Sequence, residues 1–139
     1  MGKPSILLTR SFPKLVRKRA ARDYRATVNC SDTLWQGAEL VARAKSMDGL
    51  LISAANKMTR EVICQLPESV RIIATYSSGF EHIDLDAAKL RGIAITNTPG
   101  VMAEATADIA LLLLLAAARR AREGFELIRS GKWKGWAPE

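Results

Sequence analysis

Cysteine is scarce in this sequence of 139 residues, which contains only Cys30 and Cys64. The two lie far apart and neither belongs to a pair with metal-ligand spacing, so the pattern supports neither a zinc site nor a disulfide framework. We therefore expect two buried, free thiols and no metal site. Sparse, unpaired cysteine is typical of a reducing compartment, which predicts a cytoplasmic protein.

Long apolar runs are also lacking. The longest covers residues 109–118, which is ten residues, and a membrane-spanning helix needs about twice that number. The N-terminal segment has only three consecutive apolar residues, Ile6, Leu7 and Leu8, too few for the apolar region of a signal peptide. We expect no membrane association, and a buried or interface helix over residues 109–118.

The charge balance is basic, with 21 Lys and Arg against 14 Asp and Glu and a formal net charge of +7. Such a charge favours anionic partners, among them nucleotides, small carboxylates and nucleic acid. The basic residues concentrate at 14–25 and 119–134, where we expect solvated helix faces. Neither segment shows the regular aromatic interleaving with which single-strand binders stack bases, so we expect no nucleic-acid binding.

What the sequence does contain is an alternation of strand-like and helix-like segments, with 48% hydrophobic residues, enough for a compact core. The pattern predicts strands at residues 5–9, 26–28, 50–53, 70–75 and 93–96. It predicts helices at residues 13–24, 33–46, 59–66 and 84–90, with Ser31 or Asp32 capping the second, and one long helix at 102–129.

This order predicts an α/β fold, a flavodoxin-like parallel sheet flanked by helices. Right-handed connections place the carboxyl ends of all strands at one edge, where open α/β sheets bind their ligands. Ser53, the turn at residues 77–79 and residues 98–100 should therefore share one rim. The turn of Ser77, Ser78 and Gly79 suits a small anion.

Three motifs together resemble a known family. They are Ser78-x-x-x-His82-Ile83-Asp84, Thr98-Pro99-Gly100 and Ala103-Glu104-Ala105-Thr106-Ala107-Asp108. The combination resembles the D-isomer-specific 2-hydroxyacid dehydrogenases, most closely the glyoxylate/hydroxypyruvate reductases. The likeness extends over the whole chain, and although each motif alone is weak, the combination is specific.

The resemblance implies a particular domain organisation. Residues 1–100 would be the substrate-binding (catalytic) domain, and residues 101–139 the interdomain and dimerisation helix and segment. The nucleotide-binding domain would be absent from this chain, which has no two glycines spaced as Gly-x-Gly. We expect NAD or NADP in the complete enzyme, with the choice left open, and neither bound to this chain alone.

The resemblance also implies where substrate binds. The backbone N–H groups of Ser78, Gly79 and Phe80 would hold the carboxylate of a 2-oxo or 2-hydroxy acid, with Gly79 allowing close approach and a positive φ. A plain turn glycine is the alternative. Ser53 and Ala54 would line the same pocket and leave room for a small acid.

No catalytic residue is expected in this chain, because the family's arginine and its histidine–carboxylate pair would lie downstream. We expect His82, the single histidine, to be a surface or helix-capping residue. In similar enzymes a threonine in the place of Thr106 meets the nicotinamide-ribose side of the cofactor, with helix packing as the alternative.

The segment after the long helix is expected to contact a second subunit. In similar reductases a tryptophan of this segment reaches the partner subunit's substrate pocket, which makes Trp136 a candidate substrate contact, with simple dimer packing as the alternative. The apolar long helix would otherwise be exposed, so we expect a homodimer or swapped oligomer through residues 102–136.

The function implied is that of the substrate-binding part of an NAD(P)-dependent D-2-hydroxyacid dehydrogenase. The complete enzyme would reduce a small 2-oxo acid, glyoxylate- or hydroxypyruvate-like, by hydride transfer, and this chain alone would be inactive. The alternative is a catalytically inert binding and dimerisation module of the same fold. Whether the chain is a natural truncation, a proteolysed product or an engineered fragment stays open.

Overall fold

The computed structural model describes residues 2–136, which belong to two compact units, Met1–Gly100 and Val101–Glu139. The sequence predicts a boundary at the same residue, and the roles that it assigns to the two segments stay predictions. Each unit is described by itself below.

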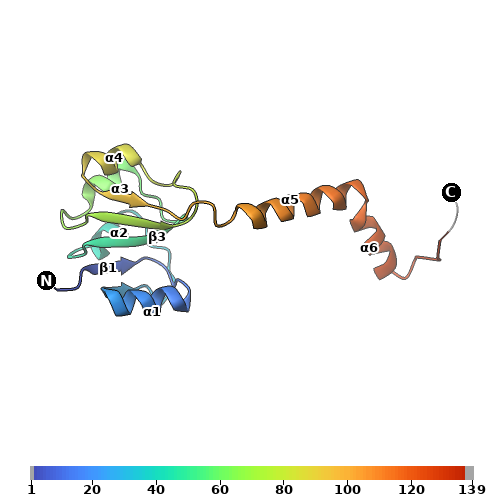
Figure 1. Ribbon diagram of the computed structural model, residues 1–139, viewed down its shortest axis with the longest axis horizontal. Helices are drawn as coiled ribbons and strands as arrows, with labels where there is room; N and C mark the ends of the chain where they lie inside the picture. The colour runs from blue at the N-terminus through green and yellow to red at the C-terminus, as the bar shows by residue number, and fades with distance from the viewer. Residues whose placement is uncertain (1, 137–139) are drawn as a thin grey trace. The chain divides into compact units, whose positions relative to one another are not determined.

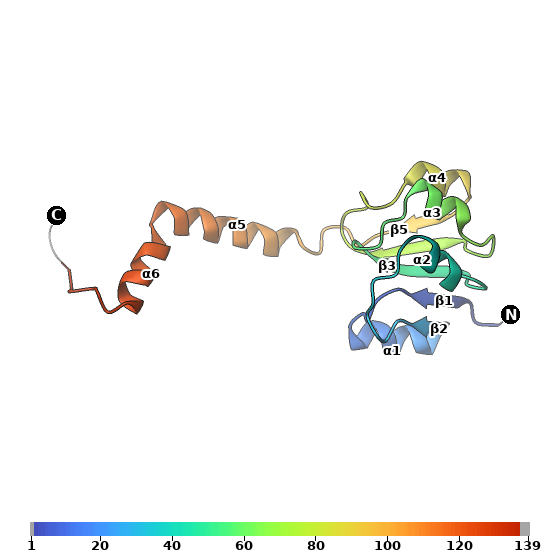
Figure 2. The same ribbon diagram turned by 180° about the vertical axis from the view of Figure 1, so that it is seen from behind.

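The first unit is a five-stranded sheet in which every neighbouring pair of strands is parallel, in the order β2-β1-β3-β4-β5. The strands are β1 (Ser5–Leu8), β2 (Arg25–Val28), β3 (Gly49–Ser53), β4 (Ile72–Tyr76) and β5 (Ala94–Thr96). The helices are α1 (Lys14–Asp23), α2 (Gly37–Arg43), α3 (Arg60–Gln65) and α4 (Leu85–Leu90). Figures 1 and 2 show α1 beside β1 and β2 and α4 toward the other side of this unit. The predicted flavodoxin-like sheet is confirmed.

Alternate residues of each strand face opposite sides of the sheet, and the two sides have different cores. On one side a large apolar cluster joins Leu7, Leu50, Ile52 and Ile73 to helices α2, α3 and α4. On the other side a smaller cluster joins helix α1 and the loop before it to strands β1, β2 and β3; its members are Val16 and Ala20 of α1, Phe12 of the loop, and the strand residues Ile6, Leu8, Ala26, Val28 and Leu51. This second face is covered only partly, since Ile72 and Tyr76 of β4 are 40% and 50% exposed.

Helices α3 and α4 begin where side chains cap them. Thr59 accepts a hydrogen bond from the backbone N–H of Val62, and Asp84 accepts one from Ala87. Each side chain satisfies an N–H that has no partner within its own helix. An isolated bridge between Met58 and Ile83 holds the two helix starts side by side.

Helix α2 is shorter than predicted, beginning at Gly37 instead of residue 33, and neither Ser31 nor Asp32 caps it. Asp32 has a φ of 56° and pairs with the Arg10 guanidinium at 2.8 Å, so its carboxylate is engaged elsewhere. The residues from 32 to 36 are not helical, Gln36 among them is extended, and Trp35 is buried in the larger core with 6% of its surface exposed. Burial of this indole therefore outweighed the helical pattern.

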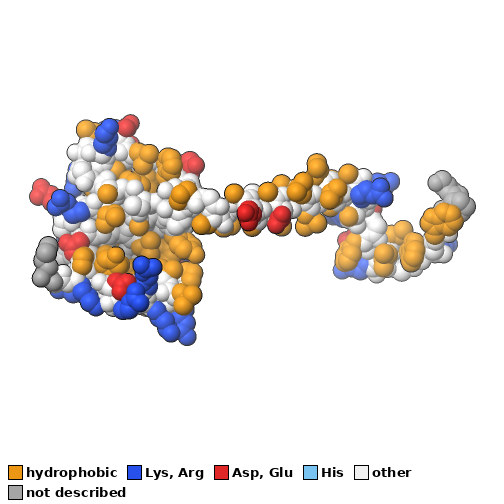
Figure 3. Space-filling view, in the orientation of Figure 1, with side chains coloured by type: hydrophobic (Ala, Val, Ile, Leu, Met, Phe, Trp, Pro, Cys, Tyr) orange, Lys and Arg blue, Asp and Glu red, His pale blue; other side chains and the backbone are white. Residues whose placement is uncertain are grey.

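The second unit contains α5 (Ala103–Ala118) and α6 (Ala121–Arg129), where the sequence predicts one continuous helix. The helix breaks at Arg120, which has a φ of 50°. Leu111 to Leu115 are each about 60% exposed, and Figure 3 shows hydrophobic side chains along most of α5. No helix within residues 2–136 is long and apolar enough to cross a membrane.

Both cysteine side chains are exposed, so the prediction of two buried thiols is wrong. Cys30 follows β2 in the loop, and Cys64 lies on α3, whose buried positions are Val62 and Ile63. Cys64 thus lies on the exposed face of a short helix. The distance between the two cysteines in the sequence does not reveal which face of the helix this residue occupies.

Candidate functional site

The carboxyl ends of β3, β4 and β5 place the predicted substrate residues along one edge of the sheet. Ser53, the last residue of β3, pairs with Tyr76 of β4, two residues before Ser78. The Ser78 hydroxyl donates a hydrogen bond to the Thr98 carbonyl, 3.0 Å away, which ties the turn after β4 to the segment after β5. Five predicted residues, Ser53, Ala54, Ser78, Gly79 and Phe80, therefore belong to this rim.

Three successive carbonyl groups of the turn after β4 accept hydrogen bonds. The Thr98 N–H donates to the Ser77 carbonyl at 2.9 Å, and the Asn97 amide donates to the Ser78 carbonyl at 2.7 Å. The Ser77 hydroxyl donates to the Gly79 carbonyl at 2.7 Å. Three adjacent peptide groups are thus held in place by their oxygens.

The N–H groups of the same three peptides are those of Ser78, Gly79 and Phe80. A trans peptide points its N–H away from its C=O, and the described residues contain no cis peptide bond. Among residues 2–136, none of these three N–H groups donates a hydrogen bond. Successive unpaired N–H groups in a turn suit an anion such as a carboxylate.

Gly79 does not have the positive φ that the sequence suggests, so that part of the prediction is wrong. The space beside its Cα is instead taken by the Glu81 side chain, because a Cβ at position 79 would clash with the Glu81 carboxylate. Absence of a side chain at Gly79 therefore gives room beside the turn, and a flexible acidic group lies there.

His82 is buried, with 9% of its surface exposed, which corrects the prediction of a surface or capping residue. Its Nε2 lies 2.9 Å from the Thr75 hydroxyl, and Thr75 lies 2.7 Å from the Ser77 hydroxyl. Burial lowers the pKa of His82, the positive charge of Lys57 lowers it further, and Glu81 opposes both effects. The neutral imidazole is thereby favoured.

On the β3 side of the rim, the buried Asn56 holds the turn that follows Ser53. Its Oδ1 accepts hydrogen bonds from the Ser53 N–H at 3.0 Å and from the Thr9 hydroxyl at 2.9 Å. Its amide group donates to the Trp35 carbonyl at 3.0 Å. The sequence interpretation missed Asn56, although an Asn shortly after a strand is a signal for a side chain that closes a turn.

Thr106 and Trp136 lie in the second unit. Thr106 is an exposed residue near the start of α5, and Trp136 follows α6 with 84% of its surface exposed. Their assignments to cofactor and substrate stay predictions.

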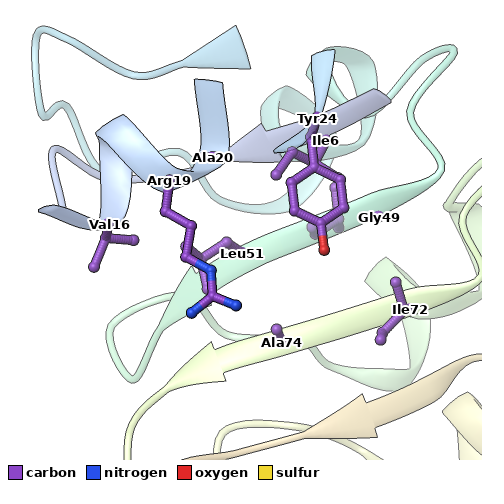
Figure 4. A pocket seen from close by; sticks show the side chains of 10 residues that line it. Ile6, Val16, Arg19, Ala20, Tyr24, Gly49, Leu51, Ile72 and Ala74 are labelled. Atoms are coloured by element: carbon purple, nitrogen blue, oxygen red, sulfur yellow. The ribbon is translucent and has the colours of Figure 1, made fainter. Parts of the chain in front are cut away.

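A separate apolar hollow of about 280 Å³ lies on the partly covered face of the sheet, beside α1 (Figure 4). Gly49 and Ile72, the first residues of β3 and β4, line it, so it extends toward the amino ends of the strands. Arg19 and Tyr24 bring the polar groups that border it. The groups suited to bind an anion are at the opposite ends of the strands.

Comparison with known proteins agrees with this fold. Residues 6–132 match the family model of the D-isomer specific 2-hydroxyacid dehydrogenase catalytic domain, and the chain therefore belongs to this family. It is 46% identical over 138 residues to a glycerate dehydrogenase of Hyphomicrobium methylovorum, covering 99% of this chain and 43% of the relative. It is 36% identical over 140 residues to a glyoxylate reductase of Thermococcus litoralis, covering 98% of this chain and 42% of that protein.

Solved structures show the same relation. A chain from Polaromonas sp. JS6 66, assigned to this family as an NAD-binding member, superposes with a TM-score of 0.81 at 36% identity, over 98% of this chain and 43% of that one. The NADPH-dependent glyoxylate/hydroxypyruvate reductase of Sinorhizobium meliloti, in complex with NADP and malonate, gives a TM-score of 0.76 at 28% identity, over 99% and 42%. The chain spans about two fifths of the length of these relatives.

Proposed function

We propose that the first unit binds the carboxylate of a small 2-oxo or 2-hydroxy acid at the N–H groups of Ser78, Gly79 and Phe80. The observation that carries this proposal is that all three N–H groups lack an acceptor among the described residues while the carbonyls of the same peptides are held. Ser53 and Ala54 line the same rim with small side chains. The net charge of +7 also favours an anionic ligand.

In the complete enzyme, we propose that this site holds a glyoxylate- or hydroxypyruvate-like acid while its keto group is reduced. Support comes from the relatives, among them the glyoxylate reductase of Thermococcus litoralis and the Sinorhizobium reductase whose structure contains NADP and malonate. Malonate is itself a small dicarboxylate. Hydride transfer would come from a nicotinamide cofactor, and the residues of this chain bind and orient the substrate.

The residues of this chain do not themselves fit the pyrophosphate of a dinucleotide. Its nine glycines include no Gly-x-Gly pair with which a loop could approach phosphates closely. We therefore propose that NAD or NADP binds mainly to another domain of the complete enzyme. Thr106 is the residue of this chain that we assign to the nicotinamide-ribose side of that cofactor.

For the second unit we propose assembly with another copy of the chain, as a homodimer or swapped oligomer through residues 102–136. The supporting observation is the apolar surface of α5, whose leucines 111–115 have no cover within their unit. Trp133 and Trp136, 57% and 84% exposed, are suited to such an interface. Trp136 is also our candidate for contact with the partner's substrate.

The second candidate function is a catalytically inert binding and dimerisation module. It is favoured by the lack of a dinucleotide loop in this chain. Such a module would keep the carboxylate turn and the apolar helices without carrying out hydride transfer.

The test is oxidation of NADH and of NADPH in the presence of glyoxylate or hydroxypyruvate, with the intact mass measured on the same sample. We expect turnover from a polypeptide of about 35 kDa or more, the size of two ordinary domains, and none from the 15.2 kDa chain. Turnover by the 15.2 kDa chain would contradict the proposed division of labour. A longer protein that is inactive with both acids would favour the inert module.

A further inference from the structure

We propose that His82, Thr75 and Ser77 form a one-way hydrogen-bond chain that fixes the direction of the Phe80 N–H in the carboxylate-binding turn. They would be positioning residues, because they act on the ligand through the backbone and do not touch it. The ligand in this inference rests on the proposed function. The orientation of the Phe80 N–H rests on geometry alone and can be tested without a ligand.

The direction of the chain follows from the number of hydrogens that each group carries. The Ser77 hydroxyl has one hydrogen, which it donates to the Gly79 carbonyl at 2.7 Å. In the 2.7 Å contact between Ser77 and Thr75, the donor must then be Thr75. Thr75 has no further hydrogen, so Nε2 of His82 must donate across the remaining 2.9 Å. His82 is thus the Nε2–H tautomer.

The chain ends on the peptide that joins Gly79 to Phe80. Fixing the Gly79 carbonyl fixes the plane of this peptide, and the Phe80 N–H then points the opposite way, away from the Ser77 hydroxyl. The preceding two peptides are held differently, by Thr98 and by Asn97 from the segment after β5. Loss of these hydrogen bonds should therefore free the orientation of the Phe80 N–H and leave the N–H groups of Ser78 and Gly79 in place.

Two of the three members, Thr75 and His82, are shielded from water, which would otherwise compete for their hydrogen bonds, while Ser77 is partly exposed. Thr75 is 2% exposed and His82 is 9% exposed. A buried imidazole that uses Nε2 to donate to a hydroxyl is a rigid anchor, whereas an exposed serine alone would rotate freely. In this arrangement the buried His82 anchors the peptide that carries one of the three proposed anion-binding N–H groups.

The test compares Ser77→Ala with Ser69→Ala in the 139-residue chain. Ser69 also donates its hydroxyl to a carbonyl, that of Met47 at 2.8 Å, but it lies before β4, at the other end of that strand. Residual dipolar couplings report the orientation of the N–H groups of Ser78, Gly79 and Phe80 without ligand. Titration with oxalate, an unreactive small dicarboxylate, gives the affinity of the site.

We expect Ser77→Ala to change the coupling of Phe80, to leave those of Ser78 and Gly79 near their wild-type values, and to weaken oxalate binding about fivefold, as for loss of one ordinary hydrogen bond. Ser69→Ala should change neither quantity. Ser77→Thr, which keeps a hydroxyl at this position, should keep the Phe80 coupling and the oxalate affinity near their wild-type values. His82→Gln, which can still donate from Nε2, should resemble the wild type more than His82→Leu does.

The outcomes separate this inference from the proposed function. An unchanged Phe80 coupling and unchanged oxalate affinity in a folded Ser77→Ala variant would overturn the positioning role and leave the carboxylate site intact. A wild-type chain that does not bind oxalate, but whose Phe80 coupling changes in Ser77→Ala, would uphold the positioning role and count against the proposed ligand.

Discussion

The Glu81 carboxylate lies beside the Cα of Gly79, the middle residue of the three whose N–H groups have no acceptor among the described residues. A negative charge there repels an incoming carboxylate through Coulomb interaction, which salt screens at an exposed position. Glu81→Gln should therefore raise the affinity for oxalate about threefold at low salt, with a smaller gain at high salt.

Calorimetric titration at two salt concentrations measures this effect. Glu68→Gln is the matched control, because it removes the same charge from an exposed residue before β4, at the other end of that strand. Equal gains in the two variants would mean that net charge alone attracts the ligand, and a loss of affinity in Glu81→Gln would show that Glu81 assists binding.

Asp32 gives a pH-dependent contribution to stability. Hydrogen bonds from Arg10 and from the Ser11 N–H, the former the larger cause, hold the pKa of this carboxyl below its ordinary value of 3.8. Because the folded-state pKa is the lower one, the contribution is present above pH 3.8 and is lost as the pH falls below it. In Asp32→Asn, the free energy of unfolding should therefore depend less on pH below 3.8 than it does in the wild type.

Urea unfolding between pH 2 and pH 6, roughly the range in which carboxylates titrate, checks this prediction. Asn tolerates the left-handed backbone that Asp32 adopts, so the variant changes charge with little added strain. Glu68→Gln serves as the exposed-acid control. If the free energy of unfolding of Asp32→Asn fell as steeply at acid pH as that of the wild type, Asp32 would not be the source of this pH dependence.

At the scale of single residues, the sequence predicts the turn at residues 77–79 because Ser77, Ser78 and Gly79 follow an apolar strand. It does not predict that His82 is buried, because the Thr75 hydroxyl that satisfies it is itself placed by the fold. The same holds for Asn56, whose partners Thr9 and Trp35 come from distant segments. Hydrogen bonds between residues that are distant in the sequence produce no periodic pattern from which they could be predicted.

Arg91, just after α4, joins two neighbouring helices. Its guanidinium donates hydrogen bonds to the carbonyls of Ile63 at 3.0 Å, Cys64 at 2.7 Å and Leu66 at 2.9 Å, which lie at the end of α3. The Ile63 carbonyl also accepts the Leu66 N–H at 3.3 Å, whereas Arg91 is the only partner that the described residues give the Cys64 and Leu66 carbonyls. Arg91→Ala should lower the free energy of unfolding by about 2 kcal/mol, as for loss of charged hydrogen bonds.

Denaturant unfolding of Arg91→Ala and Arg91→Lys tests this link. Lysine keeps the charge but lacks the planar fork that spans several carbonyls. We therefore expect the free energy of unfolding of Arg91→Lys to lie between that of the wild type and that of Arg91→Ala. Stability unchanged in both variants would show that water satisfies the α3 carbonyls equally well.

At the scale of elements, the strands and helices α1, α3 and α4 lie close to their predicted bounds, whereas α2 and the long C-terminal helix do not. Strands β1 to β5 fall within two residues of their predicted bounds because apolar runs mark them. Helix α2 begins at Gly37 instead of residue 33, because Trp35 is buried in the core and the segment before Gly37 is not helical. The break at Arg120 could not be predicted, because neither glycine nor proline occurs at that point of the sequence.

For the molecule as a whole, the apolar helix α5 predicts association. We expect the chain to sediment as a dimer or larger oligomer, because exposed patches of this kind drive assembly. Leu112 and Leu115, three positions apart on α5 and each 61% exposed, share one face. The double change Leu112→Glu with Leu115→Glu should shift the chain toward a 15.2 kDa monomer.

Sedimentation velocity over a range of concentrations measures the assembly, with circular dichroism as the check that helices persist. Leu15→Glu is the control, since Leu15 is an exposed leucine of α1 in the first unit, with 81% of its surface exposed. A wild-type monomer at all concentrations, or an oligomer unaffected by the double change, would contradict assembly through α5.

The measurement that tests the account most directly is an amide NMR titration of the wild-type chain with oxalate, beside the uncharged oxamide. We predict that oxalate shifts the N–H resonances of Ser78, Gly79 and Phe80 more than any others, and that oxamide has little effect. Shifts confined to the basic residues of α1, or no shifts at all, would contradict a carboxylate site at the carboxyl end of β4.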